Sequence, residues 1–162
     1  GSPAEILSRA NQTICANNPM EMFVTVWLGI LELSTGRLIA ANAGHEYPVL
    51  KKAGGRFELL RDKHGFVIGG MNGVKYKEYE LLLEPGAKLF LYTDGIPEAA
   101  DATGSMFGTA RMLAALNKEP DLTPEQILKT VRTEVNGFVN EAEPFDDLTM
   151  LCIEYTGPTN RP

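Results

Sequence analysis

The chain has 162 residues, of which 44% are hydrophobic and 22% are charged, as in an ordinary globular domain. Fifteen Lys and Arg residues against 21 Asp and Glu residues give a net charge of -6, which disfavours non-specific binding to nucleic acid or anionic lipid. No apolar run approaches the roughly 20 residues that cross a bilayer. We therefore expect a cytoplasmic location, in a parent protein that could carry a membrane or sensor region elsewhere.

The two cysteines, Cys15 and Cys152, have no metal-ligand spacing and are too few for a disulfide scaffold. Two reduced, buried thiols are therefore expected. Residues 1–2 read as an expression scar, residues 3–156 as one domain and residues 157–162 as a tail.

The first half of the chain predicts one helix followed by strands. Apolar residues recur at helical spacing over residues 3–16, and Pro3 suits a first helical position. Strands are predicted, in chain order, over residues 22–33, 37–42, 47–51, 56–60 and 74–83. The first strand is apolar at nearly every position, so we expect it to be covered on both faces. Short turns between these runs indicate hairpins and a predominantly antiparallel sheet.

The second half adds two strands and two helices. Residues 88–93 form a buried-type strand that ends at Asp94, and residues 109–117 form a short helix. Residues 123–126 have the form of a capping box, which opens the clearest helix, and residues 148–155 form a last strand. Strands first and helices later, with one helix at the start, indicate an α+β layered domain.

Asp94 is the first candidate site residue, because it follows a strand that looks fully buried. Gly95 lets the chain turn sharply beside it. A carboxylate held rigidly at the rim of a core suits hard cations such as Mg²⁺ and Mn²⁺. Asp-Gly is also a common turn signal, so a plain strand-ending turn is the alternative.

A second candidate is the pair Asp146 and Asp147, directly before the final strand. Adjacent carboxylates repel one another unless they are solvated or bridged by a cation, so a metal site and a solvated strand end both fit. Residues 42–48 form a tight connection, in which Gly44 and His45 are interpreted as turn residues. His64 is interpreted as a polar loop residue, and no Ser/His/Asp or Cys/His arrangement accompanies either histidine.

Taken in order, three stretches resemble one known family: residues 23–25 with 41–45, residues 91–95 with 97–99, and residues 145–149. They resemble the SpoIIE-like, or RsbU-type, branch of the PP2C (PPM) metal-dependent serine/threonine protein phosphatases. The resemblance extends from about Ile6 to Tyr155 and includes the Phe107-Gly108 step. It implies a PP2C-like α-β-β-α sandwich of two mainly antiparallel sheets flanked by helices, here without its N-terminal strands.

The resemblance also implies a site. Asp94 and Asp146 match metal ligands of the family, Asp147 and Gly95 have supporting roles, and Gly44 and His45 match a structural turn. In the intact domain, two Mn²⁺ or Mg²⁺ ions about 3.5 to 4 Å apart would activate a water that attacks phosphorus. No side chain would act as the nucleophile.

The implied function is a phosphoserine/phosphothreonine protein phosphatase of a bacterial signalling protein of the sigma-factor partner-switching type. Its substrate would be a phosphorylated anti-sigma-factor antagonist or a similar small regulatory phosphoprotein. Relatives carry an upstream Gly-Asp motif that is not found here, so a partial domain with weak or no activity is expected. Exposed sheet edges predict a homodimer.

Two alternatives to an enzyme stay open. One is a non-catalytic phosphatase-like module that binds a phosphoprotein, and the other is a purely structural α+β domain with acidic turns.

Overall fold

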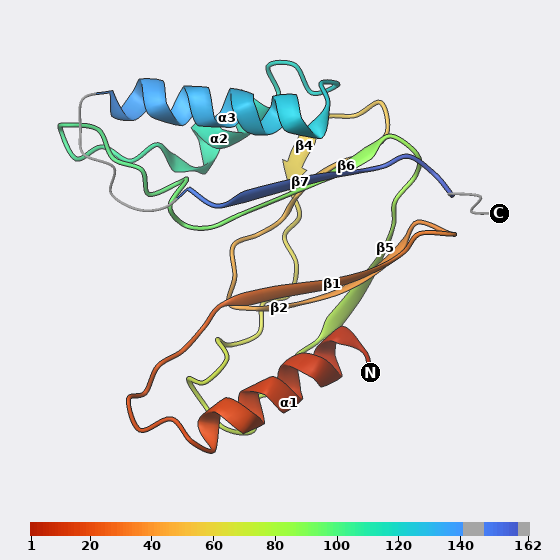
Figure 1. Ribbon diagram of the computed structural model, residues 1–162, viewed down its shortest axis with the longest axis vertical. Coiled ribbons are helices and arrows are strands. Elements are labelled where there is room, and N and C mark those ends of the chain that lie inside the picture. Colours follow the sequence, from red (N-terminus) through yellow and green to blue (C-terminus); the bar gives the residue numbers. More distant parts are fainter. Residues whose placement is uncertain (141–147, 159–162) are drawn as a thin grey trace. The chain divides into compact units, whose positions relative to one another are not determined.

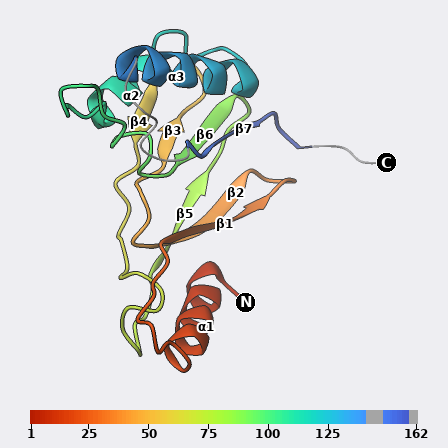
Figure 2. The same cartoon turned by 60° about the vertical axis from the view of Figure 1, so that its left-hand side comes forward.

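The computed structural model describes residues 1–140 and 148–158. Two compact units are present, and each is built on one antiparallel sheet (Figure 1 and Figure 2). Of the described residues, the first unit contains 1–45, 61–83 and 157–158, and the second contains 46–60 and 84–156. The chain thus leaves the first unit after His45, returns to it at Arg61 and leaves it again after Leu83.

The first unit combines one helix with a three-stranded sheet in the order β1-β2-β5. Its elements are α1 (Pro3–Cys15), β1 (Val26–Glu32), β2 (Arg37–Ala43) and β5 (Glu78–Leu82). Helix α1 begins with a capping box, in which the Ser2 hydroxyl accepts from the Glu5 amide and the Glu5 carboxylate accepts from the Ser2 amide. This reciprocal pairing satisfies two of the amide groups that a helix start leaves without partners.

Helix α1 contributes to the core of the first unit through its apolar stripe. The buried cluster consists of Leu7, Ala41, Ala43, Ile68 and Tyr76. The fully buried Asn11 side chain adds two hydrogen bonds. Its amide nitrogen donates to the Met71 carbonyl at 2.9 Å, and its oxygen accepts from the Gly69 amide at 2.9 Å. The segment before β5 is therefore fixed to α1.

The second unit has a four-stranded sheet in the order β4-β3-β6-β7, with two helices over one face. Its elements are β3 (Val49–Lys51), β4 (Phe57–Leu59), β6 (Ala87–Tyr92), α2 (Gly108–Leu116), α3 (Pro124–Val139) and β7 (Met150–Tyr155). Helix α3 starts at the predicted capping box, formed by Thr123 and Gln126. Its buried residues Ile127, Val131 and Val135 join Phe90 of β6 in one hydrophobic core.

Two lysines are buried in the sheet of the second unit. Lys51 and Lys88 are register partners on β3 and β6, and they are 1% and 3% exposed. The Lys51 ammonium lies 2.8 Å from a carboxylate oxygen of Asp121, and the Lys88 ammonium lies 3.6 Å from Glu154. These pairs offset part of the cost of burying charge. The hydrogen bond from Lys51 lowers the pKa of Asp121.

The α+β class with mainly antiparallel sheets is confirmed, and all three helices lie where the sequence predicted them. The expectation that the strand over residues 22–33 is covered on both faces is wrong. The strand is shorter, no residue of β1 is buried, and Ile30 is 44% exposed, because β1 is an edge strand of its sheet.

Two smaller differences concern Cys15 and the predicted strand over residues 74–83. Both thiols are free and Cys152 is buried, but Cys15 is only half-buried, because it is the last residue of α1. Strand β5 starts at Glu78, since the chain before it places Tyr76 in the hydrophobic core.

Candidate functional site

The turn at Asp94 starts directly after β6. The Thr93 amide donates to the Thr149 carbonyl at 3.2 Å, which extends the contact between the two strand ends. The chain then turns, as the Ile96 amide donates to the Thr93 carbonyl at 3.2 Å and the Glu98 amide to the Asp94 carbonyl at 2.9 Å. Ile96 is fully buried in the core of the second unit. The backbone of Asp94 is therefore held from both sides.

The segment that follows this turn is fixed by its own backbone bonds. The Phe107 amide donates to the Ala99 carbonyl at 2.7 Å, and the Gly108 amide to the Pro97 carbonyl at 2.8 Å. Gly108 has a φ of 76°, a conformation that favours glycine, and α2 begins at this residue. Residues 97–108 thus form a closed loop between the Asp94 turn and α2.

The Asp94 side chain itself is exposed, while Gly95 beside it is buried. An exposed carboxylate on a fixed backbone can offer its oxygens to a hard cation. Among residues 1–140 and 148–158, no group of three or more His, Cys, Asp or Glu side chains is arranged to hold a metal ion. Asp146 and Asp147 lie outside the described residues. Of the predicted site, the structure therefore describes Asp94, Gly95, Gly44 and His45.

Gly44 and His45 form a turn at the end of β2 in the first unit. The Asn42 side chain closes it, because its oxygen accepts from the His45 amide at 2.8 Å and its nitrogen donates to the His45 carbonyl at 3.1 Å. Gly44 has a φ of 73°, and a Cβ atom there would lie 2.7 Å from Cγ1 of Val67. The His45 ring bonds to the Thr25 hydroxyl at 3.2 Å.

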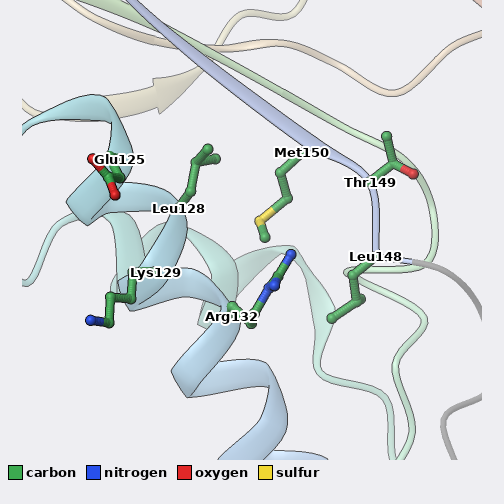
Figure 3. A pocket seen from close by; sticks show the side chains of 7 residues that line it. All are labelled: Glu125, Leu128, Lys129, Arg132, Leu148, Thr149 and Met150. Carbon is green, nitrogen blue, oxygen red and sulfur yellow. The ribbon is translucent and has the colours of Figure 1, made fainter.

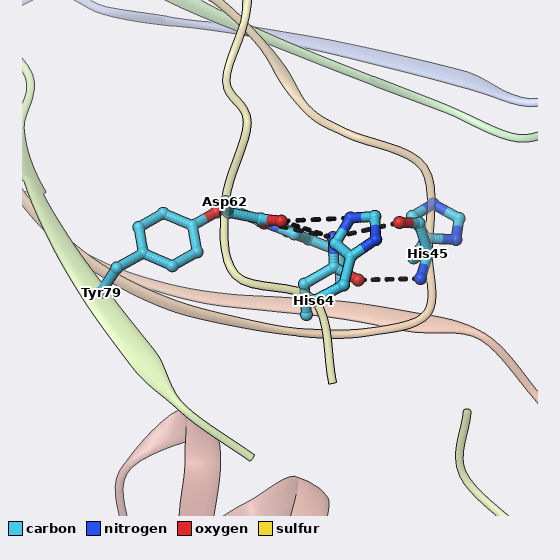
Figure 4. Close-up of polar contacts among 6 residues, drawn as sticks. His45, Asp62, His64 and Tyr79 are labelled. Carbon is cyan, nitrogen blue, oxygen red and sulfur yellow. Dashed lines mark hydrogen bonds and ion pairs between the residues drawn. The ribbon is translucent and has the colours of Figure 1, made fainter. Parts of the chain in front are cut away.

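A buried carboxylate next to this turn, Asp62, was not found from the sequence. Its side chain is completely buried and accepts from the Tyr79 hydroxyl at 3.0 Å and the Asn42 amide at 3.1 Å (Figure 4). The His64 ring nitrogen Nε2 lies 3.1 Å from the other carboxylate oxygen. The Trp27 indole donates to the Tyr79 hydroxyl at 2.8 Å, and burial raises the pKa of Tyr79.

This network joins three strands of the first unit to the segment that starts at Arg61. Trp27 lies on β1, Asn42 on β2 and Tyr79 on β5, so all three strands bind Asp62 directly or through one hydroxyl. Because Asn42 and Tyr79 of the sheet both donate to Asp62, the network holds the segment that starts at Arg61 against the sheet. The network therefore stabilises the Gly44–His45 turn and does not present a reactive group.

Two curated relatives match the sequence. Protein IcfG of Synechocystis sp. is 31% identical over 134 residues, which cover 83% of this chain and 21% of that protein. Phosphoserine phosphatase RsbU of Bacillus subtilis is 26% identical over 104 residues, which cover 63% of this chain and 30% of that protein. The chain thus spans less than a third of the length of either relative.

Two solved structures have the same fold. The SiaA-PP2C domain of Pseudomonas aeruginosa has a TM-score of 0.76 and 25% identity, covering 94% of this chain and 61% of that one. The phosphatase domain of SpoIIE from Bacillus subtilis, presoaked with Mn, has a TM-score of 0.66 and 18% identity, covering 100% of this chain and 70% of that one. The fold is therefore that of the PP2C phosphatases.

The family model described as Stage II sporulation protein E (SpoIIE) matches residues 1–156, so the chain belongs to the SpoIIE family. Its sequence and its fold place it in the SpoIIE/RsbU-like branch of the PP2C family. Within the described residues, no helix combines the length and apolar character that a membrane span requires.

Proposed function

We propose that this chain is part of a Mg²⁺- or Mn²⁺-dependent phosphoserine/phosphothreonine protein phosphatase in a bacterial signalling protein. The substrate is a phosphorylated anti-sigma-factor antagonist or a similar small regulatory phosphoprotein of a partner-switching pathway, and the site of action is the cytoplasm. Membership of the SpoIIE family and the match to RsbU support this proposal.

The observation that carries the proposal is the placement of Asp94. Its carboxylate is exposed. The backbone of Asp94 is fixed between the end of β6 and the buried Ile96. Exposed oxygens on a fixed backbone are what a hard cation requires of a protein ligand.

In the proposed site, Asp94 and Asp146 hold the metal, while Asp147 and Gly95 support them. Bound Mn²⁺ or Mg²⁺ would neutralise phosphoryl oxygens and make a water acidic enough to act as nucleophile. Gly95 is buried directly beside Asp94. No Ser or Cys nucleophile is required.

We also propose that this chain alone hydrolyses phosphoprotein weakly or not at all, because it covers only 61% of the SiaA-PP2C domain and 70% of the SpoIIE phosphatase domain. The test is phosphate release from a phosphoserine peptide by this chain and by the full-length protein, each with and without Mn²⁺. Activity only in the full-length protein with Mn²⁺ is expected. Full activity of this chain by itself would refute the incomplete site, and Mn²⁺-independent hydrolysis would refute the metal mechanism.

A second candidate is a non-catalytic module that binds a phosphoprotein. In the same assay, this candidate predicts that the full-length protein binds the phosphoserine peptide and releases no phosphate at any Mn²⁺ concentration.

We also propose that the chain associates with a second copy of itself to form a homodimer. Strand β1 is an edge strand, and the segment before it exposes Met22 and Phe23 at 69% and 64%. Unpaired edges and exposed apolar side chains promote association. Sedimentation at high concentration should give a dimer, and a clean monomer would contradict this part.

A further inference from the structure

A groove lies in the second unit between α3 and the start of β7 (Figure 3). Its volume is about 420 Å³, and its lining residues are Glu125, Leu128, Lys129, Arg132, Leu148, Thr149 and Met150. Leu128, Leu148 and Met150 are half-buried and form an apolar surface. In Figure 3 the Arg132 side chain extends from α3 toward β7, between Met150 and Leu148. The groove therefore combines an apolar surface with a cation.

The groove contains two exposed cations. Lys129 and Arg132 are exposed, and neither is ion-paired within the described part of the chain. Other cations of this unit, in contrast, have carboxylate partners: Lys118 pairs with Glu134 at 2.6 Å, and Lys51 pairs with Asp121. Two exposed cations beside apolar side chains complement a ligand that carries both acidic and apolar groups.

The groove lies at the same sheet end as Asp94. Tyr92 and Met150 are register partners on β6 and β7, and the Thr93 amide donates to the carbonyl of Thr149, which lines the groove. Asp94 is the next residue after Thr93. A phosphoprotein whose phosphorylated residue lies at Asp94 would therefore place neighbouring residues of its chain at the groove.

From this geometry we propose that the groove binds the segment of the substrate that flanks the phosphorylated residue, and that this segment is acidic and apolar. The inference rests on the proposed phosphatase function and adds a determinant of substrate choice. Carboxylates of the segment pair with Lys129 and Arg132, while an apolar side chain contacts Leu128 and Met150. Glu125 is the one acidic residue among the described lining residues, and it repels an acid at its end of the groove.

Binding of peptides measures this preference without requiring catalysis. Two fluorescent phosphoserine peptides of equal length are compared, one with Glu and Leu flanks and one with Lys and Leu flanks. Fluorescence anisotropy with this chain should show tighter binding of the acidic peptide, and the difference should shrink as salt is added. Equal affinity for both peptides would overturn the proposal.

The double variant K129E/R132E tests which residues are responsible. It should weaken binding of the acidic peptide by about tenfold, since each surface pair contributes modestly and reversal adds repulsion. The matched control is K52E/R56E, which makes the same charge change at exposed positions of the β3–β4 hairpin in the same unit. Equal weakening in both variants would assign the effect to net charge and overturn the proposal.

Hydrolysis of para-nitrophenyl phosphate by the full-length protein with Mn²⁺ separates this inference from the proposed function. This small substrate has no flanking chain, so K129E/R132E should keep the wild-type rate while losing activity on the acidic peptide. A parallel loss on both substrates would refute a docking role. Absence of hydrolysis in the wild-type protein would refute the phosphatase proposal, whereas the anisotropy result would still decide the peptide preference.

Discussion

The Asp62→Ala substitution should destabilise the first unit strongly. The Asp62 side chain is completely buried and accepts hydrogen bonds from Tyr79 and Asn42. A hydrogen bond to a charged group contributes roughly 1.5–3 kcal/mol, and each buried donor left without an acceptor costs about 1–3 kcal/mol. His64 is partly exposed and can hydrogen-bond to water instead, so we do not count its contact with Asp62. We therefore expect the substitution to lower the free energy of unfolding by about 3 kcal/mol.

Trp27 makes this loss easy to measure. It is the single tryptophan of the chain and donates to the Tyr79 hydroxyl, so its fluorescence reports on the unit that contains the substitution. In urea titrations, Asp62→Ala should lower the unfolding free energy by about 3 kcal/mol, equivalent to a Tm lower by roughly 6–12 °C in a domain of this size. Asp62→Asn keeps one acceptor and should lose less.

The control is Glu80→Ala, which removes an ion pair with Arg37 whose side chains are 49% and 55% exposed. Its unfolding midpoint should match that of the wild type, because exposed pairs contribute little. Tyr79→Phe completes a double-mutant cycle with Asp62→Ala, and the two losses should be less than additive. An Asp62→Ala variant as stable as the Glu80→Ala control would refute the structural role of the network.

Three further predictions concern packing, pH and thiol reactivity. Gly65→Ala should cost about 1–3 kcal/mol in urea unfolding, because a Cβ atom there lies 2.5 Å from Cδ1 of Tyr76; an unchanged midpoint would contradict the packing. The pKa of Asp121 is lowered from 3.8 by Lys51, so its pairing stabilises the fold above that value and is lost as pH falls through the lower folded-state pKa. Asp121→Asn should therefore be less stable than wild type at pH 7, and the difference should shrink below about pH 4, as measured by urea midpoints across pH. Burial raises the pKa of Cys152 to about 11, so iodoacetamide at pH 8 should label it only in urea, as peptide mass spectrometry would show; rapid native labelling would contradict its burial.

Local sequence signals predicted the helices well. Pro3 at the start of α1 and the Thr123–Gln126 capping box at the start of α3 act within one turn of the chain, so neighbouring residues suffice to identify them. The strand before Asp94 was equally clear, because β6 is buried almost throughout and its residues 89–92 form a continuous run of apolar and aromatic side chains.

Strand ends and burial depended on distant partners. Val24 lies in the predicted strand over residues 22–33, but it forms only an isolated bridge with Ile68, and β1 begins at Val26. Apolar composition could not show that β1 is an edge strand, because edges are set by the order of strands in the sheet.

The Asp62 network could not be predicted from the sequence for the same reason. Its partners Asn42 and Tyr79 lie 20 and 17 residues away on different strands, and no spacing in the sequence links them. The run Asp62-Lys63-His64 is typical of a solvent-exposed loop, and the Asp62 side chain becomes buried only through the fold. In contrast, Asp94 stood out because a carboxylate after a buried strand is a local feature.

We propose above that Asp94 is a metal ligand of a metal-dependent phosphatase. The most direct test is a Mn²⁺ titration of phosphate release from a phosphoserine peptide by the full-length protein and its Asp94→Asn variant. The wild type should be activated by Mn²⁺ to a saturating rate, and the variant should show no activation over the same range. If the Asp94→Asn variant reached the wild-type rate at the same Mn²⁺ concentrations as the wild type, Asp94 would not be a metal ligand.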